Sequence, residues 1–390
     1  MPRLPSAIWK CGLQDAAQSP RLLHRKPHSI FEYVFIEQEL LSQKTKKIYD
    51  FRMNKSSKKL RSTDIAKLAG VSQATVSRVL SGTGGVKPAT RDKVMEIVQQ
   101  KGYRPNVFAQ GMRTNHSATV GVAVSRITNP IVPEILEELS RQFAFHDRRV
   151  IVWNTDEQGE DSLIRAVGSG LIDGLVFTAA SHQIAALKAA QDVGLPTVSI
   201  NRAVDRVQCD QVVSTNEESA QDVARYLLKC GKTRLGFVNG PLDRTTLADR
   251  EKGFRTALDE AGHPLEPRFY YQQEFRKHAF RQLGMDIGSS TNRPDAIACG
   301  NDLIAIQILN GLKAVGCRVP EDLWVVGFDG IEMSGWDLID LTTVQQPVDL
   351  MAKEAADLLL EQIAGARSLP KTRRFRSELI VRGSTDNMRL

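Results

Sequence analysis

The chain has 390 residues, of which 42% are hydrophobic and 25% are charged, enough for a small module with one large or two medium domains. No run of roughly 18 apolar residues occurs, so the sequence predicts no membrane-spanning helix. The five cysteines are scattered without a Cys-x-x-Cys pair, which indicates reduced thiols in a cytoplasmic protein rather than disulfides or metal ligands.

The net charge of +7 is distributed unevenly along the chain. Residues 53–115 hold 12 lysines and arginines against 3 acidic residues, whereas residues 116–390 hold 31 against 37. A basic segment joined to a mildly acidic remainder is typical of a phosphate-seeking module on a body that DNA does not attract.

Residues 1–52 are mixed in composition, contain prolines and show only weak periodicity. Met53 then begins a stretch rich in lysine and serine. We expect residues 1–52 to be either a mis-assigned start or a disordered arm.

Residues 62–82 have the pattern of two short helices joined by a tight turn. The pattern predicts helices over Asp64–Leu68 and Gln73–Leu80, with Gly70 at the turn, where a positive φ angle costs least. Six apolar side chains are spaced to close a small core between the helices: Ile65, Ala66, Ala69, Val71, Val76 and Val79.

Serine and threonine precede each of these helices. Ser62 or Thr63 is expected to cap the first helix, and Ser72 the second. The outward side of the second helix then carries the short or hydrogen-bonding side chains of Gln73, Ala74, Ser77 and Arg78. Such a face suits a helix that reads the major groove of DNA, although an ordinary helical hairpin has the same core pattern.

A third helix is predicted to begin at Pro88 and to end at Gly102, followed by Tyr-Arg-Pro-Asn. With Asp-Ile-Ala, Ala-Gly-Val-Ser and Thr-Val-Ser-Arg-Val-Leu before it, the segment resembles the lac/galactose repressor family. With Thr-Arg in the first turn of the third helix, five such motifs occur in order, so we assign residues 53–104 to a helix-turn-helix DNA-binding domain.

The resemblance implies roles for individual residues of this domain and of the segment that follows. Base reading is implied for Gln73, Ala74 and Arg78, and phosphate contact or capping for Ser72, Thr75 and Ser77. Residues 105–117 match the family's hinge helix and linker, which implies minor-groove contacts by Asn106, Ala109 and Met112.

From residue 118 the pattern changes to short apolar strands that alternate with helices, which predicts parallel doubly wound sheets. A first series of strands is expected at Val120–Val124, Val150–Trp153, Gly174–Phe177 and Thr197–Ile200, and a second at Val212–Ser214, Leu235–Val238, Ala296–Cys299 and Val325–Phe328. Two series predict two lobes, and residues 118–390 resemble a periplasmic-binding-protein-like domain that binds effector and dimerises. Ser384 and Thr385 are expected to close an end strand.

The resemblance also implies an effector site between the two lobes, at the carboxyl ends of the strands. Its implied residues are Arg250, Asn301, Asp329, Asn129 and Arg202. Asp302 is expected to cap the helix that follows it, and Trp153 to stack on ligand or to belong to the core. Ile131 and Val132 stand where some members place aromatic residues, which leaves the stacking platform for a sugar in doubt.

The sequence lacks the nucleophile-elbow, P-loop and dinucleotide-binding motifs, so we expect neither an enzyme nor a cofactor or metal. We expect a cytoplasmic homodimer, associated with the nucleoid when bound, that represses transcription from a near-palindromic DNA operator. A small-molecule effector, a sugar or related metabolite, would control its operator affinity. The alternative is a DNA-binding regulator whose body binds a protein partner or no ligand.

Overall fold

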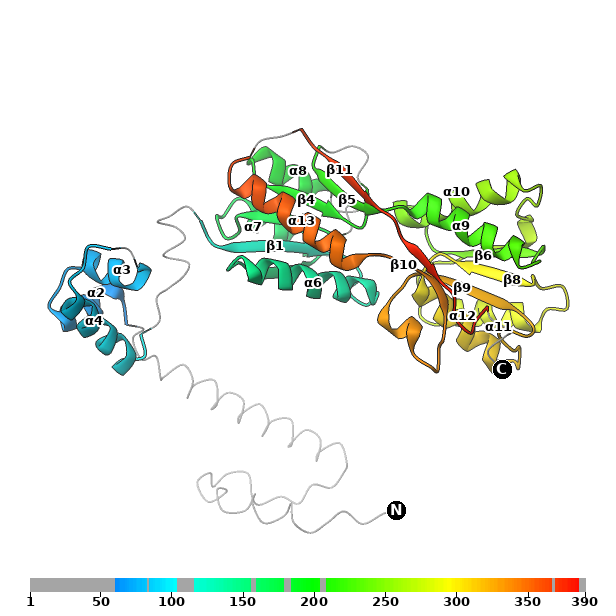
Figure 1. Ribbon diagram of the computed structural model, residues 1–390, viewed down its shortest axis with the longest axis horizontal. Helices are drawn as coiled ribbons and strands as arrows, with labels where there is room; N and C mark the ends of the chain where they lie inside the picture. Colours follow the sequence, from blue (N-terminus) through cyan, green and yellow to red (C-terminus); the bar gives the residue numbers. More distant parts are fainter. Residues whose placement is uncertain are drawn as a thin grey trace, which may run out of the picture. The chain divides into compact units, whose positions relative to one another are not determined.

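The computed structural model describes residues 60–82, 84–103, 116–155, 159–178, 184–203, 208–366 and 369–385. The chain divides into two compact units, residues 1–105 and 106–390, which we call the head and the body (Figure 1). The expected arm at residues 1–52 and the hinge residues Asn106, Ala109 and Met112 lie outside the described residues. None of the described helices is both long enough and apolar enough to span a bilayer.

The head consists of α2 (Ser62–Ala69), α3 (Gln73–Ser81) and α4 (Pro88–Gln100). Gly70 adopts a φ of +67° between the first two helices, as predicted. The predicted apolar set forms the core together with residues of α4: Ile65, Ala66, Ala69, Val76, Val79 and Val94 are buried, with Val71, Ile97 and Val98 packed against them.

One predicted cap in the head is wrong. The residue before α2 is Arg61, with extended backbone, and its N–H donates to Asp64 Oδ2 at 2.8 Å. Ser62 and Thr63 therefore lie inside the first turn, one residue too late to act as the cap. Ser72 does cap α3, because its Oγ accepts from the Thr75 N–H at 3.1 Å.

The first lobe of the body is built on an all-parallel sheet of strand order β11-β5-β4-β3-β1-β2. Its strands are β1 (Thr119–Val124), β2 (Arg149–Asn154), β3 (Gly174–Phe177), β4 (Thr197–Ile200), β5 (Asp210–Ser214) and β11 (Thr372–Phe375). Helices α6 (Ile131–Phe145) and α13 (Val348–Ile363) cover one face, and α7 (Gly159–Val167) and α8 (Ile184–Asp192) the other.

The second lobe follows a similar plan with strand order β12-β10-β9-β8-β6-β7, except that β12 runs antiparallel to β10. Its strands are β6 (Leu235–Asn239), β7 (Tyr270–Gln272), β8 (Ala296–Cys299), β9 (Trp324–Asp329), β10 (Thr342–Gln345) and β12 (Glu378–Ile380). Helices α9 (Asn216–Lys229) and α10 (Thr245–Glu260) pack on one face of this sheet, and α11 (Ala279–Ser289) and α12 (Asp302–Ala314) pack on the other. Short 3₁₀ turns lie at Pro267–Phe269 and Glu332–Gly335.

Two sequence-based expectations about the strands are wrong. The strand at Asp210–Ser214 pairs with β4 and so belongs to the first sheet rather than opening the second series. Ser384 and Thr385 lie in a turn beyond β12, where Ser384 Oγ donates to the Val325 carbonyl and accepts from the Thr342 N–H. Pairing between distant strands decided both cases, and a local apolar pattern does not contain that information.

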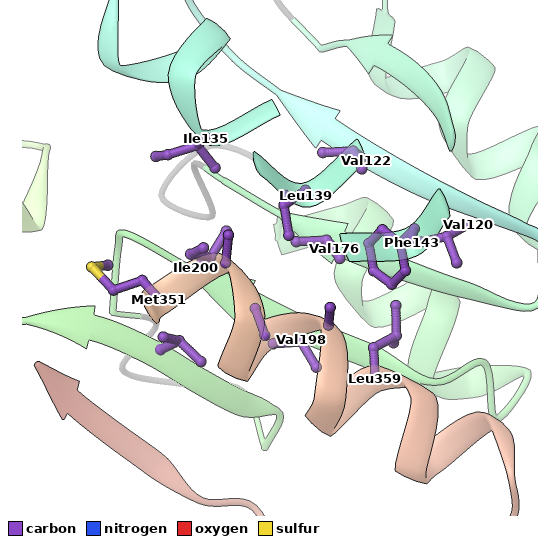
Figure 2. Packing of buried hydrophobic residues seen from close by; sticks show 14 of the residues in the cluster. Val120, Val122, Ile135, Leu139, Phe143, Val176, Val198, Ile200, Met351 and Leu359 are labelled. Atoms are coloured by element: carbon purple, nitrogen blue, oxygen red, sulfur yellow. The ribbon is translucent and has the colours of Figure 1, made fainter. Parts of the chain in front are cut away.

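The apolar side chains in the core of the first lobe determine which side of each helix packs on the sheet. Ile135, Leu139 and Phe143 recur at helical spacing along α6 and point toward the apolar strands (Figure 2). Met351 and Leu359 of α13 contribute to the same cluster (Figure 2). A helix late in the sequence therefore completes the core of a sheet built mainly from early strands.

The chain passes between the lobes three times, after β5, after β10 and after β11. Hydrogen bonds join these crossing segments. The Thr215 N–H donates to the Phe375 carbonyl at 2.9 Å, and Ser214 Oγ donates to Gln346 Oε1 at 2.7 Å. The crossing after β5 is therefore bonded to each of the other two.

Candidate DNA-reading helix and effector cavity

The exposed face of α3 carries the three residues expected to read bases. Gln73, Ala74 and Arg78 are all exposed, whereas Val76 and Val79 of the same helix are buried in the head core. Ala74 and Arg78 are four residues apart and so share one side of the helix. One side of α3 thus stays exposed with hydrogen-bonding side chains, and the other side packs in the core of the head.

The hydroxyl residues of α3 have local partners. Ser72 Oγ and Thr75 Oγ1 lie 2.9 Å apart at the helix start, and Gln73 Nε2 donates to Ser62 Oγ at 3.2 Å. Ser77 is half-buried. The Gln73–Ser62 bond joins the first turn of α3 to α2. Contact with DNA by the hydroxyl residues stays a prediction.

A cavity lies between the two lobes of the body, where the carboxyl ends of the parallel strands meet. Its volume is about 30 Å³, room for only a few water molecules. The first lobe contributes Ser125, Arg126, Asn129, Ile131, Val132, Thr178, Asn201 and Arg202, and the second Arg244, Thr246, Leu247, Arg250, Phe275, Asn301, Leu303 and Asp329.

All five residues expected to bind effector line this one cavity, although they are separated by up to 200 positions in the chain: Asn129, Arg202, Arg250, Asn301 and Asp329. Each lies at or just beyond the end of a strand or at the start of a helix, except Arg250, which lies in the second turn of α10. Trp153 instead packs in the core between β2 and the α7–α8 layer. Binding of ligand by the five residues remains a prediction.

Three of the seven described non-glycine residues with a positive φ angle line this cavity. Arg126, Asn201 and Asp329 adopt φ angles of +53°, +74° and +122°, a region that side-chain-bearing residues rarely enter. Such conformations persist only where the surroundings over-determine them, and they cluster at binding sites.

Four residues form what we call the ion-pair cluster: Arg250, Asp329, Asn216 and Gln346. The guanidinium of Arg250 lies 2.9 Å from Asp329 Oδ1, donates from Nε to Asn216 Oδ1 at 2.8 Å, and donates to the Gly300 carbonyl at 2.7 Å. It also stacks on the Phe328 ring at 3.7 Å. Gln346 Nε2 donates to Asp329 Oδ1 at 2.9 Å.

The ion-pair cluster is therefore buried and internally compensated. Burial raises the pKa of the Asp329 carboxyl, while the adjacent Arg250 guanidinium opposes that rise. Gln346 lies on the segment that follows β10 and accepts from Ser214, so the cluster reaches two of the three crossings between the lobes.

The structure corrects one helix cap at the cavity. Asn301, not Asp302, caps α12, because Asn301 Oδ1 accepts from the Ile304 N–H at 2.9 Å. Asp302 is the first helical residue and turns to the β9 end instead, where its carboxylate accepts from the N–H groups of Gly330 and Ile331 and from Thr343 Oγ1. Only the Nδ2 group of Asn301 remains to donate to a ligand.

Asp302 is fully buried beside Asp329. Burial and the negative charge of Asp329 raise the pKa of Asp302 to about 7, against the effect of its three hydrogen bonds. The β9 backbone passes very close to this carboxylate at Gly327, where a Cβ would lie 2.1 Å from Asp302 Oδ1.

Among the cavity residues that sequence reasoning missed are Arg126, Arg244 and Phe275. Together with Arg202, the two arginines form what we call the arginine cluster. Arg126 of the first lobe stacks on the Phe275 ring of the second lobe at 3.5 Å, and Arg244 lies 5.3 Å from the same ring. Arg126 lies two residues after the end of β1, and a position just beyond a strand is one where ligand-binding residues are expected. No local feature of the sequence marks Phe275.

Comparison with known proteins supports both parts of the chain. Residues 63–106 match "Bacterial regulatory proteins, lacI family", and residues 224–385 match "Periplasmic binding protein-like domain". The repressor PurR of Aliivibrio salmonicida is 28% identical over 329 residues, which cover 83% of this chain and 98% of that protein. PurR of Vibrio vulnificus is 29% identical, with 82% and 96% covered.

The chain belongs to the lacI family of bacterial regulatory proteins. The Lac repressor dimer bound to operator and the anti-inducer ONPF has the same fold, with a TM-score of 0.74 at 24% identity over 84% of this chain and 99% of that one. The transcriptional regulator CelR in complex with cellobiose matches with a TM-score of 0.62 at 26% identity, with 82% and 98% covered. This lacI-family chain is a transcriptional regulator and not an enzyme.

Proposed function

We propose that the chain is a DNA-binding repressor whose affinity for its operator is set by a small molecule held in the cavity between the two lobes. The observation that carries this proposal is the cavity itself: polar side chains from both lobes converge on it in a chain that also exposes a helix-turn-helix face. The relatives support the same proposal: PurR and the operator-bound Lac repressor are described as repressors, and CelR is described as a transcriptional regulator in complex with cellobiose.

In this proposal α3 enters the major groove, with Arg78 bidentate to a guanine, Gln73 on an adenine edge and Ala74 against a thymine methyl group. Ser72, Thr75 and Ser77 hold phosphates or the helix start. Asn106, Ala109 and Met112 contact the minor groove, and two copies of the chain bind the halves of a near-palindrome.

The route from cavity to operator passes through the crossing segments. A ligand that contacts Asp329 also acts on Gln346, and Gln346 is bonded to Ser214 at the end of the first lobe's β5. Effector binding would thereby change how the two lobes sit on one another, and effector and operator affinities would be coupled reciprocally.

Selection of binding sites from random-sequence DNA, followed by anisotropy measurements, tests the DNA-reading part. Selected sites are expected to form a near-palindrome. Arg78→Ala is expected to lose about 1–3 kcal/mol of discrimination at one base pair per half-site. The matched control is Arg91→Ala, which removes an exposed arginine from α4 and is expected to leave base preference unchanged.

If Arg78→Ala weakens binding to all sequences equally, Arg78 contacts phosphate and the base-reading assignment is wrong. If no sequence is enriched by the full-length protein, the proposed function itself fails.

A further inference from the structure

Two spaces of very different size meet at the mouth of the effector cavity. The cavity itself has a volume of about 30 Å³. Beside it lies what we call the outer pocket, an open space of about 490 Å³. Binding pockets for small molecules commonly measure roughly 300–1,000 Å³, so the outer pocket falls within this range and the cavity falls far below it. An effector of ordinary size therefore needs more room than the cavity offers in this conformation.

Side chains from both lobes form the wall between the cavity and the outer pocket. Arg126, Arg244 and Phe275 are the described residues that line both spaces. Arg126 follows β1 of the first lobe, whereas Arg244 precedes α10 and Phe275 lies between β7 and α11 in the second lobe. All three are half-buried. A contact between Arg126 and Phe275 therefore crosses the mouth of the cavity and joins one lobe to the other.

Arg126 lies directly over the aromatic face of Phe275. The centre of its guanidinium is 3.5 Å from the ring centroid, which is a close cation–π contact, and the guanidinium of Arg244 is 5.3 Å from the same centroid. Removal of one cation–π contact shifts an equilibrium that depends on it by about two- to thirtyfold, with the larger values where water is excluded. The contact is thus strong enough to set how often the mouth opens and weak enough to be broken.

The ring of Phe275 is held in place within the second lobe. It packs against the buried ring of Phe280, with centroids 5.5 Å apart. The Gly240 backbone passes so close that a Cβ there would lie 2.7 Å from Phe275 Cζ. A side chain at position 240 would therefore displace the ring, whereas glycine lets it rest against the backbone. The second lobe thus presents a fixed aromatic face to the first.

The first lobe holds Arg126 in an unusual backbone conformation. Its φ angle is +53°, and its carbonyl accepts from the Asn129 N–H at 2.8 Å, which closes a turn directly after β1. Residues other than glycine persist in this region only where their surroundings hold them there, and they cluster at ligand clamps and switches. The contact with Phe275 is one of the interactions that stabilise this turn.

We propose that the stack of Arg126 on Phe275 is a latch between the two lobes, and that it must open before any molecule larger than a few waters reaches the cavity. With the latch open, the cavity and the outer pocket form one continuous space of the size that small ligands need. The three crossings keep the lobes attached and serve as the hinge. As a control on effector entry, the latch rests on the proposed function.

A thiol placed inside the cavity reports how often the latch opens. Thr178 lines the cavity directly after β3 and is only 1% exposed. In the full-length Thr178→Cys protein, iodoacetamide is too large for a space of about 30 Å³ and reaches the introduced thiol only when the cavity opens. Peptide mass spectrometry measures the rate of this reaction separately from the rates at the native cysteines.

Breaking the latch is expected to accelerate this labelling. In the Thr178→Cys background, Phe275→Leu and Arg126→Gln are each expected to raise the rate by about two- to thirtyfold. Leucine keeps an apolar contact with Phe280 but has no aromatic face. Because the two residues act through one contact, the double variant is expected to react no faster than the faster single variant.

The matched control is Lys232→Gln in the same background. It removes a cation that lies 4.3 Å from the Trp324 ring, and both of these residues belong to the second lobe. The control therefore loses a cation–π contact within one lobe and is expected to label at the parent's rate. Circular dichroism checks folding, and either single variant decides if the other does not fold.

Two buried native thiols distinguish opening of the latch from a general loss of stability. Cys209 lies in the core of the first lobe and Cys299 in the core of the second, and both are expected to react at the parent's rates in every variant. Unchanged labelling of the introduced thiol in both single variants would overturn the latch.

Two other results would overturn it as well. Equal acceleration at all three thiols would show that the contact stabilises the whole body and does not control access to the cavity. Effects that multiply in the double variant would show that the two residues act independently. Failure of the full-length protein to enrich any DNA sequence would instead count against the proposed function, because the labelling does not involve DNA.

Discussion

The ion-pair cluster and the arginine cluster line the same cavity, yet their charges are balanced in different ways. Arg250 has a carboxylate, an amide oxygen, a carbonyl and an aromatic face around its guanidinium. Arg202 is nearly as buried, but its environment contains three further arginines, and its pKa falls to about 10. Acceptor groups thus surround Arg250, whereas like charges as well as Asp243 act on Arg202.

Arg250→Met is the sharpest test of the compensated side. Removing one partner leaves Asp329 buried without its counter-charge, which is expected to cost about 3–5 kcal/mol of unfolding free energy. Calorimetry of the full chain measures the loss as a lower melting temperature of the body transition.

The double variant Arg250→Met/Asp329→Leu provides the control. Because it removes both charges, it is expected to be less destabilised than Arg250→Met alone. A double variant that is worse than the single variant would mean that packing, not charge compensation, is what Arg250 contributes.

Asp302→Asn tests the buried carboxylate beside the ion-pair cluster. The folded protein holds the Asp302 proton up to about pH 7, whereas an unfolded carboxyl loses it near pH 4, so stability falls as pH rises through this window. Asparagine keeps the acceptor for Gly330 and Ile331 and cannot ionise. The variant is therefore expected to gain on the parent by about 2–4 kcal/mol between pH 5 and pH 8.

Melting temperatures of both proteins across that pH range measure the gain. Parallel curves for parent and variant would show that Asp302 does not titrate in this window.

Arg202→Gln tests the arginine cluster and has the smallest expected effect. Removing a crowded, buried positive charge relieves repulsion but also removes packing and the interactions of Arg202, so we expect a change of less than about 2 kcal/mol in unfolding free energy. The measurement is a melting temperature, with Arg141→Gln, on an exposed arginine of α6, as the control. Destabilisation as large as that of Arg250→Met would erase the distinction between the two clusters.

The structure also shows which expectations local pattern can support. The Gly70 turn, the Ser72 cap and the apolar core of the head follow from residue type and spacing within twenty positions, and all three are present. The cap at Arg61 was missed because it depends on Asp64, three residues later, and arginine is no usual cap. The Asp302 cap failed because Gly330, far along the chain, competes for its carboxylate.

Within the cavity, the resemblance pointed to Arg250, Asn301 and Asp329 by their motifs, and the fold brings them to one place. It gave no reason to select Arg126 or Arg244, whose motifs are unremarkable. Their significance comes from lying near Arg202: Arg126 approaches it within the first lobe, and Arg244 comes from the second lobe.

The sequence by itself determined the helix-turn-helix head, the two-lobed α/β body and the regulator family, because each depends on periodicity or on motifs that are contiguous in the chain. The tertiary structure alone decided which sheet β5 joins, that α13 completes the first lobe's core, and how charge is distributed around the cavity. The physical reason is that strand pairing and electrostatic crowding depend on distances through space, and residues as far apart as Arg126 and Phe275 acquire those distances only on folding.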